Sequence, residues 1–314
     1  MQQIDNRAPC LNCGSKDSEH WATARDVEYR TSDDDFEYRR CGSCDVVFIT
    51  DPPRDRLGEI YPSNYYSYTS GEPSLIDRVK HSLDRRALRC VAAGIPGDSL
   101  RVLDVGGGVG MMADAMRAAD PRVRSTAVVD LDETARDEAE RRGHDFVRSR
   151  IEDFSAGDAK FDVILAYNLI EHVDAPREVL HAFRSLITPE GRVVIKTPNI
   201  DSLDARLFRH RSWGGLHCPR HWVLFNEASL RAACESAGFD VQQFSYTQGA
   251  PFWAVSLVSA AESRRLVRRA QRTPIAELRS YRAALAVAAP LDLVRAKVAK
   301  TSQVVTVLKP RAEP

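Results

Sequence analysis

Four cysteines near the N-terminus have the spacing of a metal site. They form two pairs, Cys10-x-x-Cys13 and Cys41-x-x-Cys44. Four thiolates suit tetrahedral Zn²⁺, and a structural site of this kind can drive the folding of a module that lacks a large core. A redox dithiol would need only one pair. We therefore predict a structural zinc ion held by Cys10, Cys13, Cys41 and Cys44.

A glycine-rich loop follows an apolar run in the stretch LDVGGGVG, residues 103–110. Gly106, Gly108 and Gly110 have the spacing G-x-G-x-G. Glycine is used where the backbone turns tightly and approaches a ligand closely. A dinucleotide-binding fingerprint would require a further glycine at 111, where this chain has Met111. The loop predicts a nucleotide-like ligand other than a dinucleotide.

Two acidic residues accompany this loop. Asp104 lies two residues before the first glycine, where a carboxylate suits a ligand with a positive charge better than a pyrophosphate. Asp130 ends the next predicted strand, about twenty residues further on, where an acid can accept hydrogen bonds from both ribose hydroxyls. The pair favours a cofactor that carries a ribose and an ammonium or similar cation.

Three histidines are candidate general bases, because an imidazole titrates near neutral pH. His172 follows Glu171 in the sequence EHV, and His217 and His221 lie in WGGLHCPRHWVLF, residues 213–225. The alternative is that Glu171 and His172 only shape a loop, and that Trp213 and Trp222 belong to the core while the other two histidines are solvated. A metal site built on His217, Cys218 and His221 is less favoured than a substrate-binding loop.

The elements that would position these residues alternate between strand and helix. Strands are predicted at 100–105, 125–130, 144–148, 161–167, 191–197, 239–246 and 302–309. Helices are predicted at 74–93, 110–119, 131–142, 174–187 and 226–237, with a turn at 189–191 and Asp174 as a helix N-cap. This alternation predicts a parallel sheet with helices on both faces and ligands at the carboxyl ends of the strands.

The charges are balanced overall and uneven along the chain. The 314 residues include 44 Lys and Arg and 44 Asp and Glu, which disfavours a nucleic-acid partner because such binding depends on neutralising phosphates. Residues 261–300 hold ten Lys and Arg against three acids, a local charge of +7. Several roles are open for these basic helices. They could present a solvated face, form a cap or a dimer contact, or bind an anionic lipid or a diphosphate-linked substrate.

The domain organisation follows from these patterns. We predict a zinc-binding module at 1–50, an aromatic linker with an amphipathic helix at 51–98, a catalytic domain at 99–250 and 301–310, and a basic helical insert at 251–300. The linker stretch YPSNYYSY, residues 61–68, would close over a sugar or aromatic acceptor, or simply pack the linker onto the core.

Since MQQIDNRAPC lacks the apolar core of a signal peptide and no apolar run is long enough for a membrane span, we expect a cytoplasmic protein.

Asp104, the glycine loop, Asp130 and NLIEHV (residues 168–173) together resemble the class I S-adenosylmethionine (SAM)-dependent methyltransferases, over roughly residues 99–247 and the last strand. The resemblance implies an α/β fold with a Rossmann-like seven-stranded sheet and an antiparallel last strand. It also implies roles for individual residues. The methionine part of SAM would lie at Asp104, Gly106, Gly108 and Gly110, the ribose at Asp130, the adenine at Ile151 and Glu152, and the methyl group above Asn168. Arg150 stands near the predicted adenine position, where many members of the family have an acidic residue.

The Cys₄ module, the tyrosine-rich stretch and this core together resemble bacterial sugar methyltransferases. That resemblance implies O- or C-methylation of a sugar or glycoconjugate precursor. A quinone or phenolic O-methyltransferase is the first alternative, and an RNA methyltransferase is another. A nicotinamide-dependent oxidoreductase is disfavoured by the missing glycine, and a binding module without catalysis is disfavoured by the full set of cofactor positions.

Overall fold

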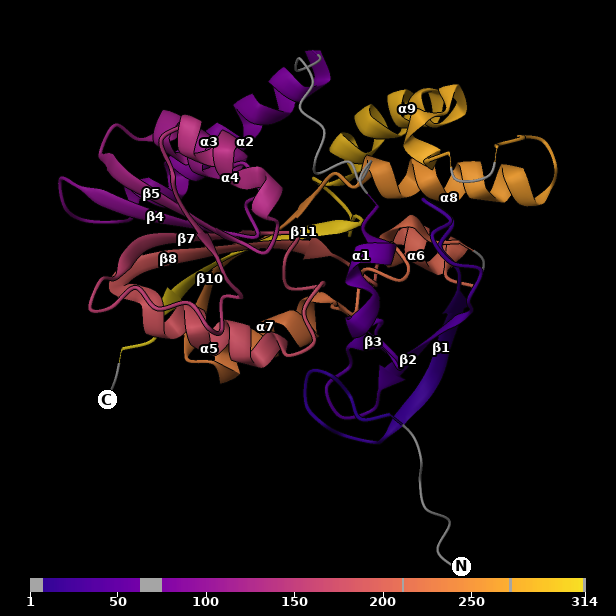
Figure 1. Cartoon of the computed structure of the whole chain (residues 1–314), viewed down its shortest axis with the longest axis horizontal. Helices are drawn as coiled ribbons and strands as arrows, with labels where there is room; N and C mark the ends of the chain where they lie inside the picture. The colour runs from indigo at the N-terminus through magenta and orange to yellow at the C-terminus, as the bar shows by residue number, and fades with distance from the viewer. Residues whose placement is uncertain (1–7, 63–74, 211, 271–272, 313–314) are drawn as a thin grey trace, which may run out of the picture.

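A seven-stranded sheet forms the centre of the computed structural model, which describes residues 8–62, 75–210, 212–270 and 273–312 (Figure 1). The strand order is β10-β11-β8-β7-β4-β5-β6. Neighbours from β8 to β6 are parallel, and β11 is antiparallel to both β8 and β10. The strands are β4 (Leu100–Val105), β5 (Val123–Asp130), β6 (Asp145–Arg148), β7 (Phe161–Tyr167), β8 (Ile187–Pro198), β10 (Phe239–Thr247) and β11 (Gln303–Pro310). The predicted fold class is confirmed, including the antiparallel last strand.

Helices cover both faces of this sheet (Figure 1). The helices on one face are α2 (Leu75–Ala93), α3 (Met111–Ala119) and α4 (Arg136–Arg141), and those on the other are α5 (Pro176–Leu186) and α7 (Glu227–Ser236). Side chains alternate along a strand, so Leu100 and Val102 pack in the cluster with α2 and α3. Leu103 and Val105 pack in the cluster with α5 and α7. Alternate side chains of β4 therefore contribute to the hydrophobic layers on the two faces of the sheet.

A second, smaller sheet is built by the N-terminal residues. Its antiparallel strands are β1 (Ser18–Ala24), β2 (Phe36–Cys41), β3 (Val47–Ile49) and β9 (Val223–Leu224), in the order β1-β2-β3-β9. Val47 pairs with Leu224 and Phe48 pairs with Val223. The N-terminal module is thus completed by a strand from a loop of the domain that carries the seven-stranded sheet.

The helical insert lies between β10 and β11 and consists mainly of α8 (Ala250–Ser263) and α9 (Arg279–Arg295). The backbone N–H of Ile275 donates to the carbonyl of Glu28 (3.0 Å), which joins the insert to the N-terminal module. In Figure 1, α8 lies between α9 and the remainder of the molecule. Among the helices of the described ranges, none has the length and apolar character needed to cross a bilayer.

The structure corrects two local predictions. The strand predicted at 191–197 begins at Ile187, so the segment predicted as a turn at 189–191 lies inside β8, where Phe161 pairs with Ile187. Helix α5 begins at Pro176 with Ala175 as its N-cap. The side chain of Asp174 forms ion pairs with arginines instead of capping the helix. Of the tyrosine-rich stretch 61–68, residues 63–68 lie outside the described ranges.

Candidate active site and metal centre

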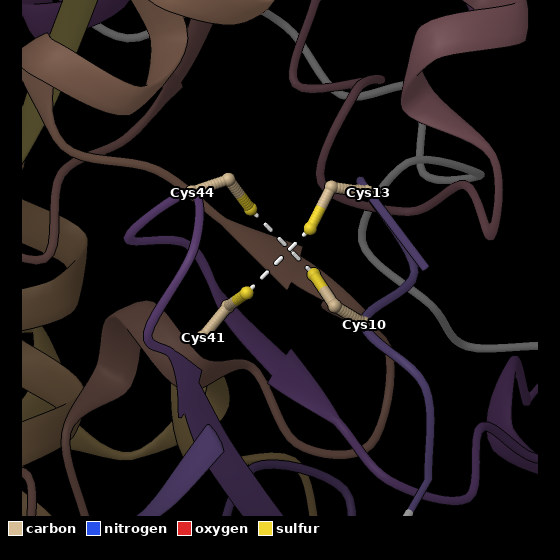
Figure 2. A group of neighbouring side chains, drawn as sticks. All are labelled: Cys10, Cys13, Cys41 and Cys44. Carbon is tan, nitrogen blue, oxygen red and sulfur yellow. Dashed lines mark hydrogen bonds between the residues drawn. The ribbon is translucent and has the colours of Figure 1, made fainter. Parts of the chain in front are cut away.

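The four predicted zinc ligands converge on one point (Figure 2). The Sγ atoms of Cys10 and Cys44 are 3.7 Å apart, and those of Cys13 and Cys41 are 3.6 Å apart. A tetrahedron with Zn–S bonds of about 2.3 Å has S–S edges of about 3.8 Å. The four thiols therefore have the chemistry and the separation that a tetrahedral zinc ion requires.

Local turns aim these thiols at one another. The N–H of Gly14 donates to the carbonyl of Cys10 (2.8 Å), and the N–H of Asp45 donates to the carbonyl of Cys41 (3.0 Å). Gly14 and Asp45 have φ angles of 74° and 62°, so each Cys-x-x-Cys segment is followed directly by a left-handed residue that reverses the chain. Asn12 donates from Nδ2 to Sγ of Cys44 (3.5 Å).

The glycine loop joins β4 to α3 in a conformation that other residues rarely adopt. Gly106, Gly108 and Gly110 have φ angles of 67°, 53° and 80°. A Cβ at Gly106 would lie 2.9 Å from Cδ1 of Leu169, whereas a Cβ at Gly108 would meet no atom within 4 Å. The loop is thus closed on one side and open at Gly108, which fits close approach by a cofactor.

The two acidic residues take different positions around the loop. Asp130, at the end of β5, accepts from the N–H of Gly108 (2.8 Å) and from the N–H of Asp132 (2.9 Å). Asp104 is 1% exposed and accepts from the N–H of Ala113 (3.0 Å). Burial raises the pKa of Asp104 to about 7, with a contribution from the nearby Asp130 charge. Asp104 lies beneath the loop, and its role toward the methionine part of SAM stays a prediction.

The remaining predicted cofactor residues lie at the same edge of the sheet, after β6 and β7. Oδ1 of Asn168 accepts from Nε2 of Gln303 on β11 (3.0 Å). Ile151 is buried, and Glu152 is 3.4 Å from an Nη atom of Arg150. Arg150 is therefore engaged by an acid beside the predicted adenine position. Their contacts to SAM stay predictions.

Three predicted catalytic residues come together just after β7. Ligand atoms of Glu171, His172 and His221 all lie within 4.8 Å of one another, and the rings of the two histidines are 4.6 Å apart. Glu171 is fully buried, and its Oε2 accepts from Oγ1 of Thr197 (2.9 Å). Its Oε1 has no hydrogen-bond partner among the described residues. Burial raises the pKa of Glu171 to about 8, so the carboxyl group is mostly protonated at neutral pH.

Both histidines of this group are neutral at neutral pH. Burial lowers the pKa of His172 to about 3, and nearby His217 lowers it further, while burial also lowers the pKa of His221. Nδ1 of His221 donates to the carbonyl of Gly215 (2.8 Å). Nδ1 of His172 lies 3.1 Å from the carbonyl of Arg220. Because a carbonyl only accepts, the proton of each ring is placed on Nδ1, which leaves a lone pair on Nε2. Such a group can accept a proton or bind a divalent metal ion.

The third histidine is held by a residue that the sequence analysis missed. Nδ1 of His217 lies 2.6 Å from Oε1 of Glu28, and its ring is 5.0 Å from that of His221. His217 and His221 are buried, so the solvated alternative is wrong. Trp213 and Trp222 are buried in a core cluster, as the same alternative expected for them.

A buried ion pair supports this loop from the N-terminal side and was also missed. The guanidinium of Arg220 pairs with Asp26 (2.9 Å), and both side chains are fully buried. Burial alone would raise the pKa of Asp26, but the charge and hydrogen bonds of Arg220 outweigh it and lower the pKa to about 2. Nε of Arg220 also donates to the carbonyl of Ile60 (2.6 Å). No spacing rule in the sequence links Asp26 to Arg220.

Comparisons with known proteins identify the domain that carries this site. The profile of a methyltransferase domain family matches residues 75–243, more than half of the chain. A curated ubiquinone biosynthesis O-methyltransferase from Cereibacter sphaeroides is 32% identical over 130 residues, which cover 40% of this chain and 53% of the relative. One of the same name from Xylella fastidiosa is 29% identical over 155 residues, which cover 46% of this chain and 63% of the relative. This chain thus matches little more than half the length of these relatives.

A solved structure from Galdieria sulphuraria, assigned to the sarcosine dimethylglycine methyltransferases, has a TM-score of 0.50 at 10% identity and covers 75% of this chain and 86% of that chain. This likeness concerns the fold alone. The family match, the seven-stranded sheet and the glycine loop lead to one conclusion: the chain belongs to the class I SAM-dependent methyltransferase family.

Proposed function

We propose that this enzyme methylates a hydroxyl group of a small-molecule acceptor, with His172 as the base that removes the proton. The observation that carries the proposal is the neutral His172 imidazole beside Glu171 and His221, just after β7. When bound, SAM supplies an electrophilic methyl group on a sulfonium. Hydrogen bonding at Nδ1 of His172 leaves Nε2 as the atom that accepts the acceptor's proton.

Other side chains keep this base in position. Oη of Tyr61 lies 3.0 Å from Nδ1 of His172 and, with the Arg220 carbonyl, fixes the orientation of the ring. Glu171 stays protonated and neutral on the buried side, so it places no charge beside the imidazole. His217 and His221 complete the wall, which excludes water from the proton transfer.

We also propose how the chain holds its cofactor. Gly106, Gly108 and Gly110 would leave room for the methionine part of SAM above buried Asp104, and the carboxylate of Asp130 would bind the ribose hydroxyls. Ile151 and Glu152 would contact the adenine, and Asn168 would lie beneath the methyl group. The open space at Gly108 supports this arrangement.

The acceptor that we favour is a phenol or quinol. A phenolic hydroxyl is more acidic than that of an ordinary alcohol, so its proton is removed more readily during methyl transfer. The names of the curated relatives, ubiquinone biosynthesis O-methyltransferases, point to the same class. Since these matches span little more than half of the relatives, the shared domain supports the class of acceptor rather than one compound.

A sugar or glycoconjugate precursor is the second candidate. The N-terminal module that supplies Asp26 and Glu28 lies outside the family match at 75–243. Acceptor specificity can therefore differ from that of the curated relatives. We propose a small-molecule acceptor in either case, without a nucleic-acid partner.

We propose that Cys10, Cys13, Cys41 and Cys44 bind one structural Zn²⁺. The sulfur separations of 3.6 and 3.7 Å support this ion. The metal would link the segment before β1 to the turn between β2 and β3. It would thereby stabilise the module that carries Asp26 and Glu28, with no direct part in methyl transfer.

An acceptor panel tests the proposal. Purified enzyme is incubated with SAM labelled in the methyl group and with catechols, quinols, nucleoside-diphosphate sugars or tRNA. We expect label on the oxygen of a catechol or quinol, and loss of that label in the His172→Ala variant. Label on the sugars alone would select the second candidate. Transfer to tRNA, or activity that His172→Ala leaves intact, would overturn the proposal.

A further inference from the structure

Helix α9 exposes an apolar stripe along its outer face. Val287, Leu291 and Val294 are 64%, 61% and 66% exposed, and Val298, in the turn that follows the helix, is 84% exposed. Their spacings of four, three and four residues place them on one side of a helix. Single exposed apolar residues are ordinary, but a continuous row is typical of an interaction surface.

A neighbouring face of α9 is already packed. Ala288 and Asp292 are buried, and Oδ2 of Asp292 accepts from the N–H of Gly249 at the start of α8 (2.6 Å). In Figure 1, α9 is the outermost element of the insert. The stripe therefore lies beside the insert's own packed face and is itself exposed.

Exposed cations lie before and after the stripe in the sequence. Exposed arginines and lysines lie in the loop before α9, in its first turn and after its end: Arg264, Arg265, Arg268, Arg279, Arg282, Lys297 and Lys300. Leu266, in the same loop, is 76% exposed. Of the three acids in 261–300, Glu262 pairs with Arg30 and Arg269 and Asp292 is buried, which leaves Glu277 at the surface. Lys300 pairs with Asp201 and Arg295 pairs with Asp292, and the segment as a whole keeps a net charge of +7 by residue count.

We propose that this outer face, the α9 stripe with its flanking cations, docks on an anionic lipid bilayer. An exposed apolar row with arginines and lysines near it can lie in the interface of such a membrane, where anionic headgroups attract the cations. A second copy of the chain fits less well, since a two-fold interface would bring the same positively charged segment against itself. This inference does not depend on the acceptor proposed above.

Vesicle sedimentation tests the proposal with the full-length enzyme. We expect cosedimentation with vesicles of phosphatidylcholine and phosphatidylglycerol in equal parts, little with phosphatidylcholine alone, and release by salt. The variants Leu291→Glu and Val294→Glu should each weaken partitioning by about tenfold or more, because they place a charge in the apolar row. Arg279→Ala should weaken it by about fivefold, the effect expected for one cation near an anionic surface.

Leu207→Glu is the matched control, since Leu207 is 59% exposed on α6 (Leu203–Phe208) and lies outside the stripe. It should bind vesicles as the parent does, and equal thermal unfolding of all variants would show that they fold. Equal binding to neutral and anionic vesicles, or unchanged binding by Leu291→Glu, would overturn the proposal. A dimer that Val294→Glu dissociates, without vesicle binding, would assign the stripe to a second copy of the chain.

Discussion

The carboxylate of Glu28 lies 2.6 Å from Nδ1 of His217, across 189 residues of sequence. The backbone carbonyl of the same Glu28 accepts from the N–H of Ile275 (3.0 Å) and from Nη1 of Arg269 (3.1 Å). One residue of the N-terminal module therefore holds a histidine of the candidate site with its side chain and the helical insert with its backbone.

Substitution of Glu28 should reduce stability through this contact. Glu28→Ala removes an acceptor from a buried imidazole, and we expect it to lower the free energy of unfolding by about 1–3 kcal/mol. Glu28→Gln keeps an acceptor and should lose less. Urea denaturation measures both. Glu37→Ala, which removes an exposed partner of Arg39, should change stability by less than about 1 kcal/mol. Equal losses for Glu37→Ala and Glu28→Ala would contradict this assignment.

Stability should fall as pH rises toward 8 because of Glu171. Its pKa is raised from an ordinary 4.5 to about 8, so the folded chain keeps a proton that the unfolded chain has lost. The unfolded state then binds fewer protons, and the free energy of unfolding decreases with pH. The lowered pKa of His172 acts in the opposite sense, but its effect is complete above about 6.5.

Glu171→Gln should therefore flatten the stability profile between pH 7 and pH 8, where the remaining titration of Asp104 contributes equally to parent and variant. We expect the parent to lose at least about 1 kcal/mol across that interval and the variant to lose less. Denaturation at closely spaced pH values is the measurement. A parent whose stability is constant there would show that Glu171 is ionised in the fold.

His172→Ala should reduce turnover while SAM binding persists. General-base catalysis contributes about 10²–10⁴-fold, so we expect a loss of kcat in that range and a SAM dissociation constant within about twofold of the parent value. His181→Ala, at an exposed position of α5, is the control. A loss of SAM affinity equal to the loss of kcat would mean that His172 supports the cofactor site instead.

Removal of the proposed metal should unfold the N-terminal module. We expect one zinc ion per chain by elemental analysis, and little in Cys44→Ser. The emission of Trp21, buried in β1, should shift to longer wavelength when the metal is removed. Cys90→Ser changes an exposed cysteine outside the cluster and should retain the zinc. A metal-free protein with the parent's unfolding temperature would refute the structural role.

Asp130→Ala should weaken SAM binding by about tenfold or more, since it removes the carboxylate proposed to bind the ribose and the acceptor for Gly108 N–H. Isothermal titration calorimetry gives the affinity. Glu133→Ala alters an exposed acid nearby and should leave it unchanged. If NADH binds and SAM does not, the cofactor assignment fails.

The alternation of apolar runs was enough to predict the central sheet, and the four cysteines and the glycine loop could be recognised because their members lie close together in sequence. The pairs Asp26–Arg220 and Glu28–His217 could not be predicted, because each joins residues about 190 positions apart. Strand β9 is two residues long, too short for a period of two to show. His172 could be proposed as the base because it lies just after the strand that became β7. Which residues surround it depends on tertiary packing and could not be predicted.

The short strand β9 also affects the order in which the protein can fold during synthesis. Val223 and Leu224, which cover the edge of β3, are made about 175 residues after Ile49. At about 5–20 residues per second, the first three strands wait roughly 10–35 s for their last partner. Throughout that interval the edge of β3 is unpaired in the nascent chain, where a chaperone or an early metal ion has time to act before the sheet is closed.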